Sequence, residues 1–83
     1  SAASDVYKRQ LYSLGVLFYN NGADVLRKAT PLASSNKEKY ASEKAKADAA
    51  FKKAVDYLGE AVTLSPNRTE IKQMQDQVKA MIK

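Results

Sequence analysis

Two breaks in helical character divide the chain and fix how many long elements it can form. Thr30-Pro31 disfavours helix just before the proline, and Ser34-Ser35-Asn36 is typical of a turn. Ser65-Pro66-Asn67 makes the second break. Elsewhere the apolar residues recur at spacings of three and four, and no stretch alternates with a period of two for long enough to make a strand. The sequence therefore predicts an all-α fold with helices over residues 5–30, 36–64 and 68–82.

The first predicted helix carries one apolar stripe along its length. Its members are Leu11, Leu14, Gly15, Phe18, Gly22, Val25, Leu26 and Ala29. Asn20, Asn21 and Gly22 are poor helix formers and together cost on the order of 2 kcal/mol relative to alanine. Because the stripe stays in phase across these three residues, we expect one continuous helix.

The other two predicted helices begin at sequences that resemble capping boxes. Ser35 can accept a hydrogen bond from the backbone N–H three residues on, and Glu38 can reach back. Asn67-Arg68-Thr69-Glu70 makes a similar start. The apolar residues of the second helix form a heptad-like seam: Ala47, Phe51, Ala54, Leu58 and Ala61. Those of the third helix also share one face: Ile71, Met74, Val78, Met81 and Ile82.

Two blocks of this pattern resemble the tetratricopeptide repeat (TPR). The first block, which resembles the repeat's first helix, is Leu11, Leu14, Gly15 and Phe18. The second, which resembles its second helix and terminating proline, is Ala54, Leu58, Ala61 and Pro66. The resemblance implies a helical hairpin in which Gly15 and Ala54 face each other, and a non-enzymatic function in protein–protein interaction.

The expected hairpin is longer than an ordinary repeat of this family, by about 27 residues inserted at its tip. An antiparallel register that sets Gly15 against Ala54 places the turn between Ser34 and Ser35, where turn residues stand. The insertion therefore lengthens both helices. The same register gives further pairs: Leu11 with Leu58, Phe18 with Phe51, Gly22 with Ala47, and Ala29 with Tyr40.

We expect three parts: an N-terminal segment (1–10) that continues into the first helix, the extended TPR-like hairpin (11–66) and a C-terminal capping helix (67–83). Ser1-Ala2-Ala3-Ser4 is typical of a cloning remnant or a frayed end. Asp5–Gln10 resembles a translated sequencing adaptor fused to a metagenomic reading frame; the alternative is a native helix start with Ser4 as N-cap.

Gln75-Asp76 replaces the Leu-Gly pair of a further repeat, which favours a cap. The cap's polar outer face is Lys72, Gln73, Asp76, Gln77 and Lys79.

We assign no catalytic, cofactor-binding or metal-binding residue. The chain has no Cys and no His, and its carboxylates lie among lysines, where pairs such as Asp48 with Lys52 are expected. The net charge of +5 does not indicate nucleic-acid binding, because acidic residues interleave with the lysines and no aromatic is spaced to stack on bases. No apolar run reaches the roughly 18–20 residues that a membrane span needs.

The TPR resemblance also implies a partner-contact face on the first helix: Tyr12, Val16, Tyr19 and Asn20. The alternative is that a preceding repeat packs over these residues. We expect the C-terminal part of a bacterial repeat protein with an unknown protein or peptide partner. A homodimer is also expected, through the outer tyrosines of the first helix or through the flank of the long hairpin. A structural or oligomerising hairpin, working through Val25, Leu26 and Tyr40, is the second hypothesis. The sequence does not distinguish the cytoplasm from the cell envelope.

Overall fold

The structure is a computed structural model that describes residues 2–82. Ser1 and Lys83, which belong to the first and last of the expected parts, lie outside the described residues. The helices are α1 (Ala2–Ala29), α2 (Leu32–Ser35), α3 (Lys37–Leu64) and α4 (Thr69–Met81). No strand occurs over residues 2–82, so the predicted all-α fold is confirmed. α1 is unbroken across Asn20, Asn21 and Gly22, as its apolar stripe predicts.

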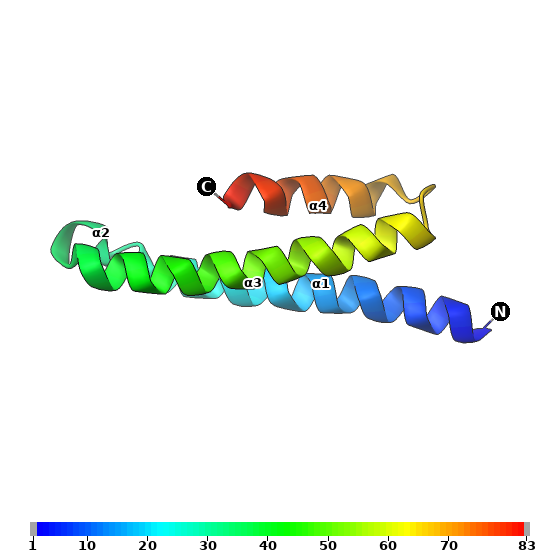
Figure 1. The fold of residues 1–83 in the computed structure, drawn as a ribbon, viewed down its shortest axis with the longest axis horizontal. Helices are drawn as coiled ribbons and strands as arrows, with labels where there is room; N and C mark the ends of the chain where they lie inside the picture. Colours follow the sequence, from blue (N-terminus) through cyan, green and yellow to red (C-terminus); the bar gives the residue numbers. More distant parts are fainter. Residues whose placement is uncertain (1, 83) are drawn as a thin grey trace.

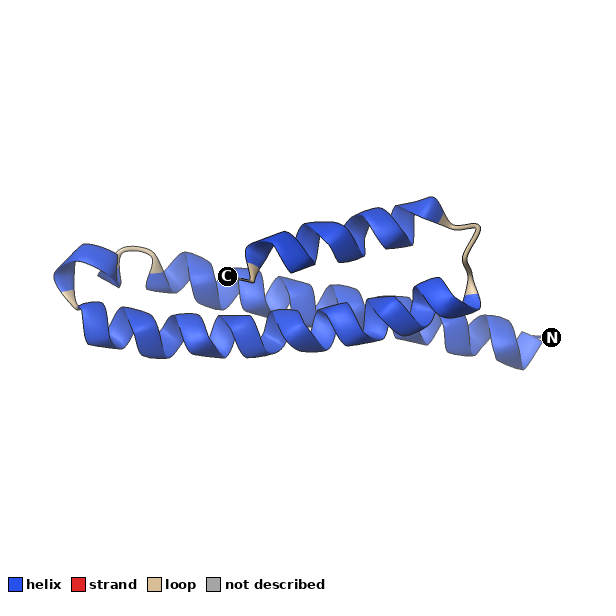
Figure 2. Ribbon diagram, turned by 45° about the horizontal axis from the view of Figure 1, so that its top comes forward, coloured by secondary structure: helices blue, strands red, loops and turns tan. Residues whose placement is uncertain are grey.

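The chain folds into a long antiparallel hairpin with one shorter helix laid along it (Figure 1). α1 and α3 run side by side, and the body measures 52 × 19 × 13 Å. α4 packs on α3 and ends well short of α2, so the tip of the hairpin has only two long helices (Figure 2). The fold is therefore a TPR-type hairpin with a capping helix, extended at its tip.

Two glycines set the register of the hairpin. A Cβ atom added to Gly15 would lie 3.5 Å from the carbonyl oxygen of Ala54, and one added to Gly22 would lie 3.1 Å from that of Ala47. The predicted pairings of Gly15 with Ala54 and of Gly22 with Ala47 are therefore confirmed. At both points the backbones approach closely because the facing residues are small.

The large side chains sit one turn away from the positions that a direct pairing gives. Leu58 covers Gly15 and Phe51 covers Gly22, each within 2.7 Å of where a Cβ would stand. Phe18 and Phe51 belong to the same register, but the ring of each one contacts a different aromatic residue. Helical side chains lean toward the N-terminus of their own helix, so Leu58 and Phe51 reach back over the preceding turn.

The aromatic side chains consequently pair differently from the prediction. Phe18 stacks on Tyr57, with ring centroids 5.6 Å apart and planes 8° from parallel. Phe51 contacts Tyr19 instead, at 6.0 Å between centroids. Lys53 Nζ lies over the Phe18 ring, 5.4 Å from its centroid, as a cation–π contact.

The hairpin tip differs from the prediction, because Ser34 and Ser35, between which the turn was expected, belong to the short helix α2. Asn36, not Ser35, is the N-cap of α3, and its side chain accepts a hydrogen bond from Lys39 N at 3.1 Å. Ser35 instead ends α2 and its hydroxyl donates to the carbonyl oxygen of Pro31 at 3.3 Å. The expected capping box was wrong because Ser35 is itself helical, whereas Asn36 has the non-helical backbone that an N-cap requires.

One other expected helix start, and the alternative start with Ser4 as N-cap, also differ from the structure. α1 already includes Ser4, since the helix begins at Ala2, so Ser4 is not its N-cap. Arg68, not Asn67, occupies the N-cap of α4, and its side chain makes no capping bond. Arg68 Nε instead donates to Glu70 Oε1 at 2.6 Å, which lowers the pKa of the Glu70 carboxyl.

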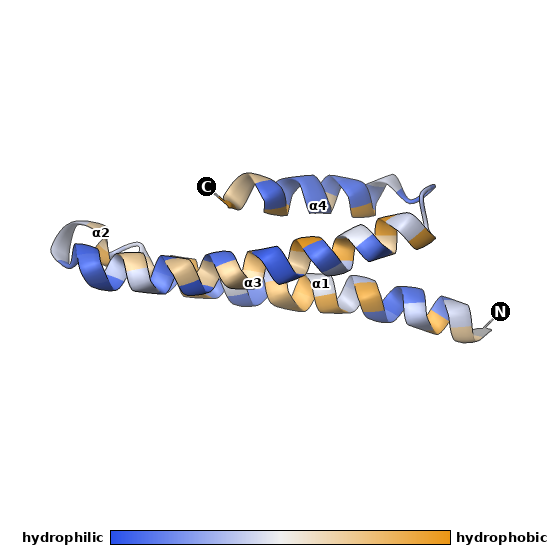
Figure 3. Cartoon of the chain, viewed as in Figure 1, coloured by the Kyte–Doolittle hydropathy of each residue, from blue (hydrophilic) through white to orange (hydrophobic). Residues whose placement is uncertain are grey.

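α4 buries one face against α3 and presents a polar face to solvent (Figure 3). Ile71 and Val78 are buried. Gln75 is buried as well, and its Nε2 donates to the Val55 carbonyl oxygen at 3.3 Å. A Cβ atom on Gly59 would lie 2.9 Å from that nitrogen, so the absence of a side chain at Gly59 leaves space for the Gln75 amide. The polar residues expected on the outer face of the cap are all exposed: Lys72, Gln73, Asp76, Gln77 and Lys79.

Candidate interaction surface

The residues that carry the repeat signature lie mainly at the contact between α1 and α3. Five of them are buried: Leu11, Gly15, Ala54, Leu58 and Ala61. Leu14 and Phe18 are half-buried at the border of this contact, and Pro66 is exposed in the loop before α4. The position of the five buried residues assigns them to packing within the hairpin.

The four residues of the expected partner-contact face are divided between two environments. Tyr12 and Tyr19 are half-buried by residues of the same chain. The Tyr12 hydroxyl donates to Met74 Sδ of α4 at 3.9 Å, and Tyr19 packs on Phe51. These two tyrosines are thus partly covered by residues of the same chain. Val16 and Asn20 lie further out on α1; Val16 is half-buried and Asn20 exposed.

The most exposed large apolar side chains of α1 are ones that the sequence reasoning missed. Leu17 is 60% exposed, Tyr7 52% and Val6 43%. Leu17 belongs to a second row with spacings of three and four on α1, which we call the outer row: Tyr7, Gln10, Leu14, Leu17, Asn21 and Asp24. The spacing of three and four residues was the sequence signal that could have identified the outer row. It was overlooked because only two members of the row, Leu14 and Leu17, are aliphatic, and Leu14 was placed in the inner stripe.

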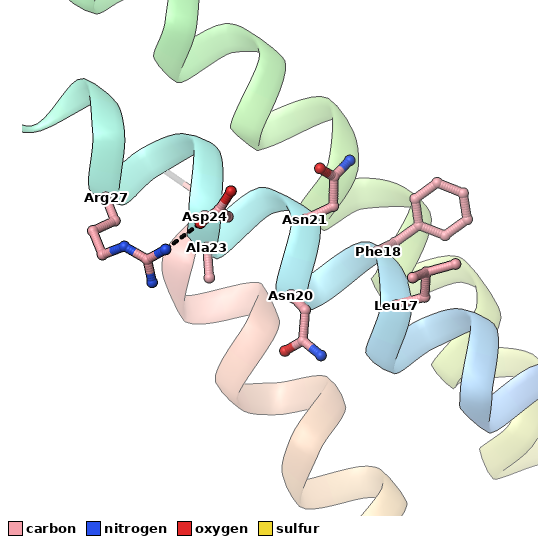
Figure 4. Close-up of a pocket in the computed structure, with 7 residues that line it drawn as sticks. All are labelled: Leu17, Phe18, Asn20, Asn21, Ala23, Asp24 and Arg27. Atoms are coloured by element: carbon pink, nitrogen blue, oxygen red, sulfur yellow. Dashed lines mark hydrogen bonds and ion pairs between the residues drawn. The ribbon is translucent and has the colours of Figure 1, made fainter.

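Three shallow hollows surround Leu17, and residues of α1 alone line each of them. The first is lined by Val6, Arg9, Gln10, Ser13, Leu14 and Leu17. The second is lined by Tyr12, Ser13, Val16, Leu17 and Asn20. The third is lined by Leu17, Phe18, Asn20, Asn21, Ala23, Asp24 and Arg27 (Figure 4). A hollow with walls from one helix is open to solvent, so it does not enclose a small molecule.

Each hollow contains four residues at positions i, i+3, i+4 and i+7 of α1. In the first they are Gln10, Ser13, Leu14 and Leu17, and in the third Leu17, Asn20, Asn21 and Asp24. This diamond is the hole that receives a side chain from a facing helix in knobs-into-holes packing. The residues around Leu17 therefore have the spacing into which side chains of a facing helix can pack, as on the surface of any α-helix.

The charged groups of the chain are mostly engaged with neighbours on their own helix. Asp24 forms ion pairs with Arg27 (Figure 4) and with Lys28. Asp48 pairs with Lys44 at 3.1 Å rather than with Lys52, so the expected Asp48–Lys52 pair is wrong. Over residues 2–82 no group of three or more Asp or Glu side chains could hold a metal ion. No described helix combines the length and apolar character needed to cross a bilayer.

Comparison with known proteins identifies one closely similar structure. No protein-family model matches the chain, and no curated protein matches it. A TPR repeats protein from Bacteroides fragilis NCTC 9343, known from a crystal structure, is 91% identical over 95% of this chain, with a TM-score of 0.92. The present chain spans 35% of the length of that protein.

Proposed function

Because the chain belongs to the TPR-like family, we propose that it is a non-enzymatic protein–protein interaction module from a bacterial helical-repeat protein, and that the outer surface of α1 around Leu17 receives its partner. The exposure of Leu17, at 60%, is the observation that carries this proposal. Leu17 shares a hollow with the exposed Val6 and with Leu14, and covering this apolar patch would remove apolar area from water.

A helical partner fits this surface better than an extended peptide. The diamonds beside Leu17 repeat with the spacing at which side chains project from a facing helix. The second wall that each hollow lacks would come from the partner's side chains. Of the expected partner-contact residues, Tyr12, Val16 and Asn20 line the second hollow, whereas Tyr19 contacts the core.

The alternative hypothesis, a structural or oligomerising hairpin that makes its contacts through the tip, has less support. Within the part of the chain that the structure describes, no large apolar side chain between residues 18 and 63 is exposed. Of the residues named for that hypothesis, Val25 and Leu26 are partly buried against the core, and Tyr40 is half-buried. Changes there would disturb folding as well as any contact at the tip.

Selection of helical peptides from a displayed library tests the proposal. We expect peptides with leucines at helical spacing to bind the chain, and Leu17→Glu to weaken their affinity by about tenfold or more, since a charge would enter an apolar contact. Leu64→Glu is the matched control, because Leu64 is 41% exposed and lies on α3. Selected peptides that bind both variants equally well would place the contact elsewhere.

A further inference from the structure

We propose that the partner of the outer row is a second copy of this chain, bound antiparallel through α1. The inference rests on the proposed function, since it names the helix that the surface around Leu17 receives. The outer row contributes six side chains to each copy: Tyr7, Gln10, Leu14, Leu17, Asn21 and Asp24. All six lie at the exposed side of α1 or at its border, and Asp24 has a side-chain exposure of 43%.

The knobs and the holes of this surface fit each other in one register. Leu17 of one copy enters the hollow between Gln10, Ser13, Leu14 and Leu17 of the other. In the same register Gln10 enters the hollow between Leu17, Asn20, Asn21 and Asp24. A two-fold axis repeats both contacts, so each copy supplies the missing wall of the other's hollows.

The polar residues of the row also complement each other in this register. Leu14 faces Leu17 of the second copy, which places four leucines at the centre. On either side Gln10 faces Asn21, and two amides can exchange donor and acceptor. At the ends Tyr7 faces Asp24, where a hydroxyl can donate to a carboxylate.

A parallel arrangement of the same rows is less favourable. It sets each residue against its own equivalent, so the two Asp24 carboxylates would face each other and repel. The dipoles of the two helices would also align head to head, whereas antiparallel helices place opposite ends together. The amide pairs and the tyrosine–carboxylate pairs of the row therefore favour the antiparallel arrangement of two identical chains.

Sedimentation equilibrium from about 10 to about 300 µM tests the dimer on the full chain. We expect the wild-type mass to rise from monomer to dimer, and Leu17→Lys to weaken association by about tenfold or more. Leu64→Lys, with the same charge change, should associate as the wild type does. Helicity measured by circular dichroism should be equal in all three. A monomeric wild type, or equal behaviour of the two variants, would overturn the proposal.

The orientation can be tested by cross-linking because the chain has no cysteine. Under mild oxidation an equimolar mixture of the Gln10→Cys and Asn21→Cys variants should yield mainly the mixed disulfide, which mass spectrometry separates from the two symmetric ones. Predominance of symmetric disulfides would overturn the antiparallel arrangement. If the wild type is monomeric yet selected peptides still depend on Leu17, the second copy is the wrong partner and the proposed function stands. If neither the association of the chain nor the binding of selected peptides depends on Leu17, the dimer and the proposed function are both wrong.

Discussion

α1 presents two rows of residues with similar spacing, and only one of them is covered by the chain itself. The inner row, against α3, has small residues where the helices cross: Gly15 and Gly22 are buried, and Ala29 is 1% exposed. The outer row has Leu14 and Leu17 at its centre. The inner row therefore supplies holes for Leu58 and Phe51, whereas the outer row supplies knobs.

Side-chain size explains why the two faces of α1 make different contacts. Glycines let the backbones of α1 and α3 approach, and the large side chains that fill the space come from α3. A row of projecting leucines cannot approach a helix closely unless that helix has matching hollows. The outer row has such hollows between its own residues, so a row of the same kind can fit it.

The largest expected contrast is between the centres of the two rows. Phe51→Ala should destabilise the fold by about 3–5 kcal/mol, because a fully buried ring is lost and a cavity remains over Gly22. Leu17→Ala should change the free energy of unfolding by less than about 0.5 kcal/mol at concentrations where the chain is monomeric. Chemical denaturation at low micromolar concentration measures both. Equal losses would mean that Leu17 is already packed in the monomer.

A smaller effect is expected from one methyl group in the inner row. Gly22→Ala should cost about 1–3 kcal/mol despite alanine's higher helix propensity, because its Cβ would stand 2.7 Å from the buried Phe51 ring and 3.1 Å from the Ala47 carbonyl oxygen.

Gly59→Ala is the control for this substitution. Its Cβ would meet only the end of the flexible Gln75 side chain. We expect its stability to change by less than about 1 kcal/mol, because alanine's higher helix propensity offsets the displacement of the Gln75–Val55 hydrogen bond. If the two substitutions changed the melting temperature equally, the close approach at Gly22 would be absent in solution.

The backbone register was predictable from sequence, and the aromatic pairing was not. The TPR resemblance implied that Gly15 faces Ala54, and the register counted from that pair correctly placed Gly22 on Ala47. The pairing of Phe18 with Tyr57, rather than with Phe51, depends on the lean of each side chain along its helix. A register counted between Cα positions does not include the direction in which each side chain leans along its helix.

The candidate surface was predicted only in part, for a related reason. The TPR resemblance implied a partner-contact face on α1, and its tyrosines supported that choice because tyrosine is common at interfaces. Tyr12 is instead covered because α4 brings Met74 to its hydroxyl, a contact between residues far apart in the chain. Leu17 carried little signal in sequence, because its row mixes leucines with amides and so lacks a continuous apolar pattern.

The smallest expected effect concerns the charge at the end of the outer row. Asp24 pairs with Arg27 and Lys28 at exposed positions, so Asp24→Asn should leave the stability of the monomer within about 0.5 kcal/mol of the wild type. In the antiparallel dimer it would weaken two contacts with Tyr7, each worth about 0.5 kcal/mol, and so raise the dissociation constant about fivefold. A parallel dimer would respond with the opposite sign, because the substitution removes the repulsion between two facing carboxylates. Sedimentation equilibrium of this one variant beside the wild type therefore distinguishes the two arrangements by the direction of the change, whatever its size.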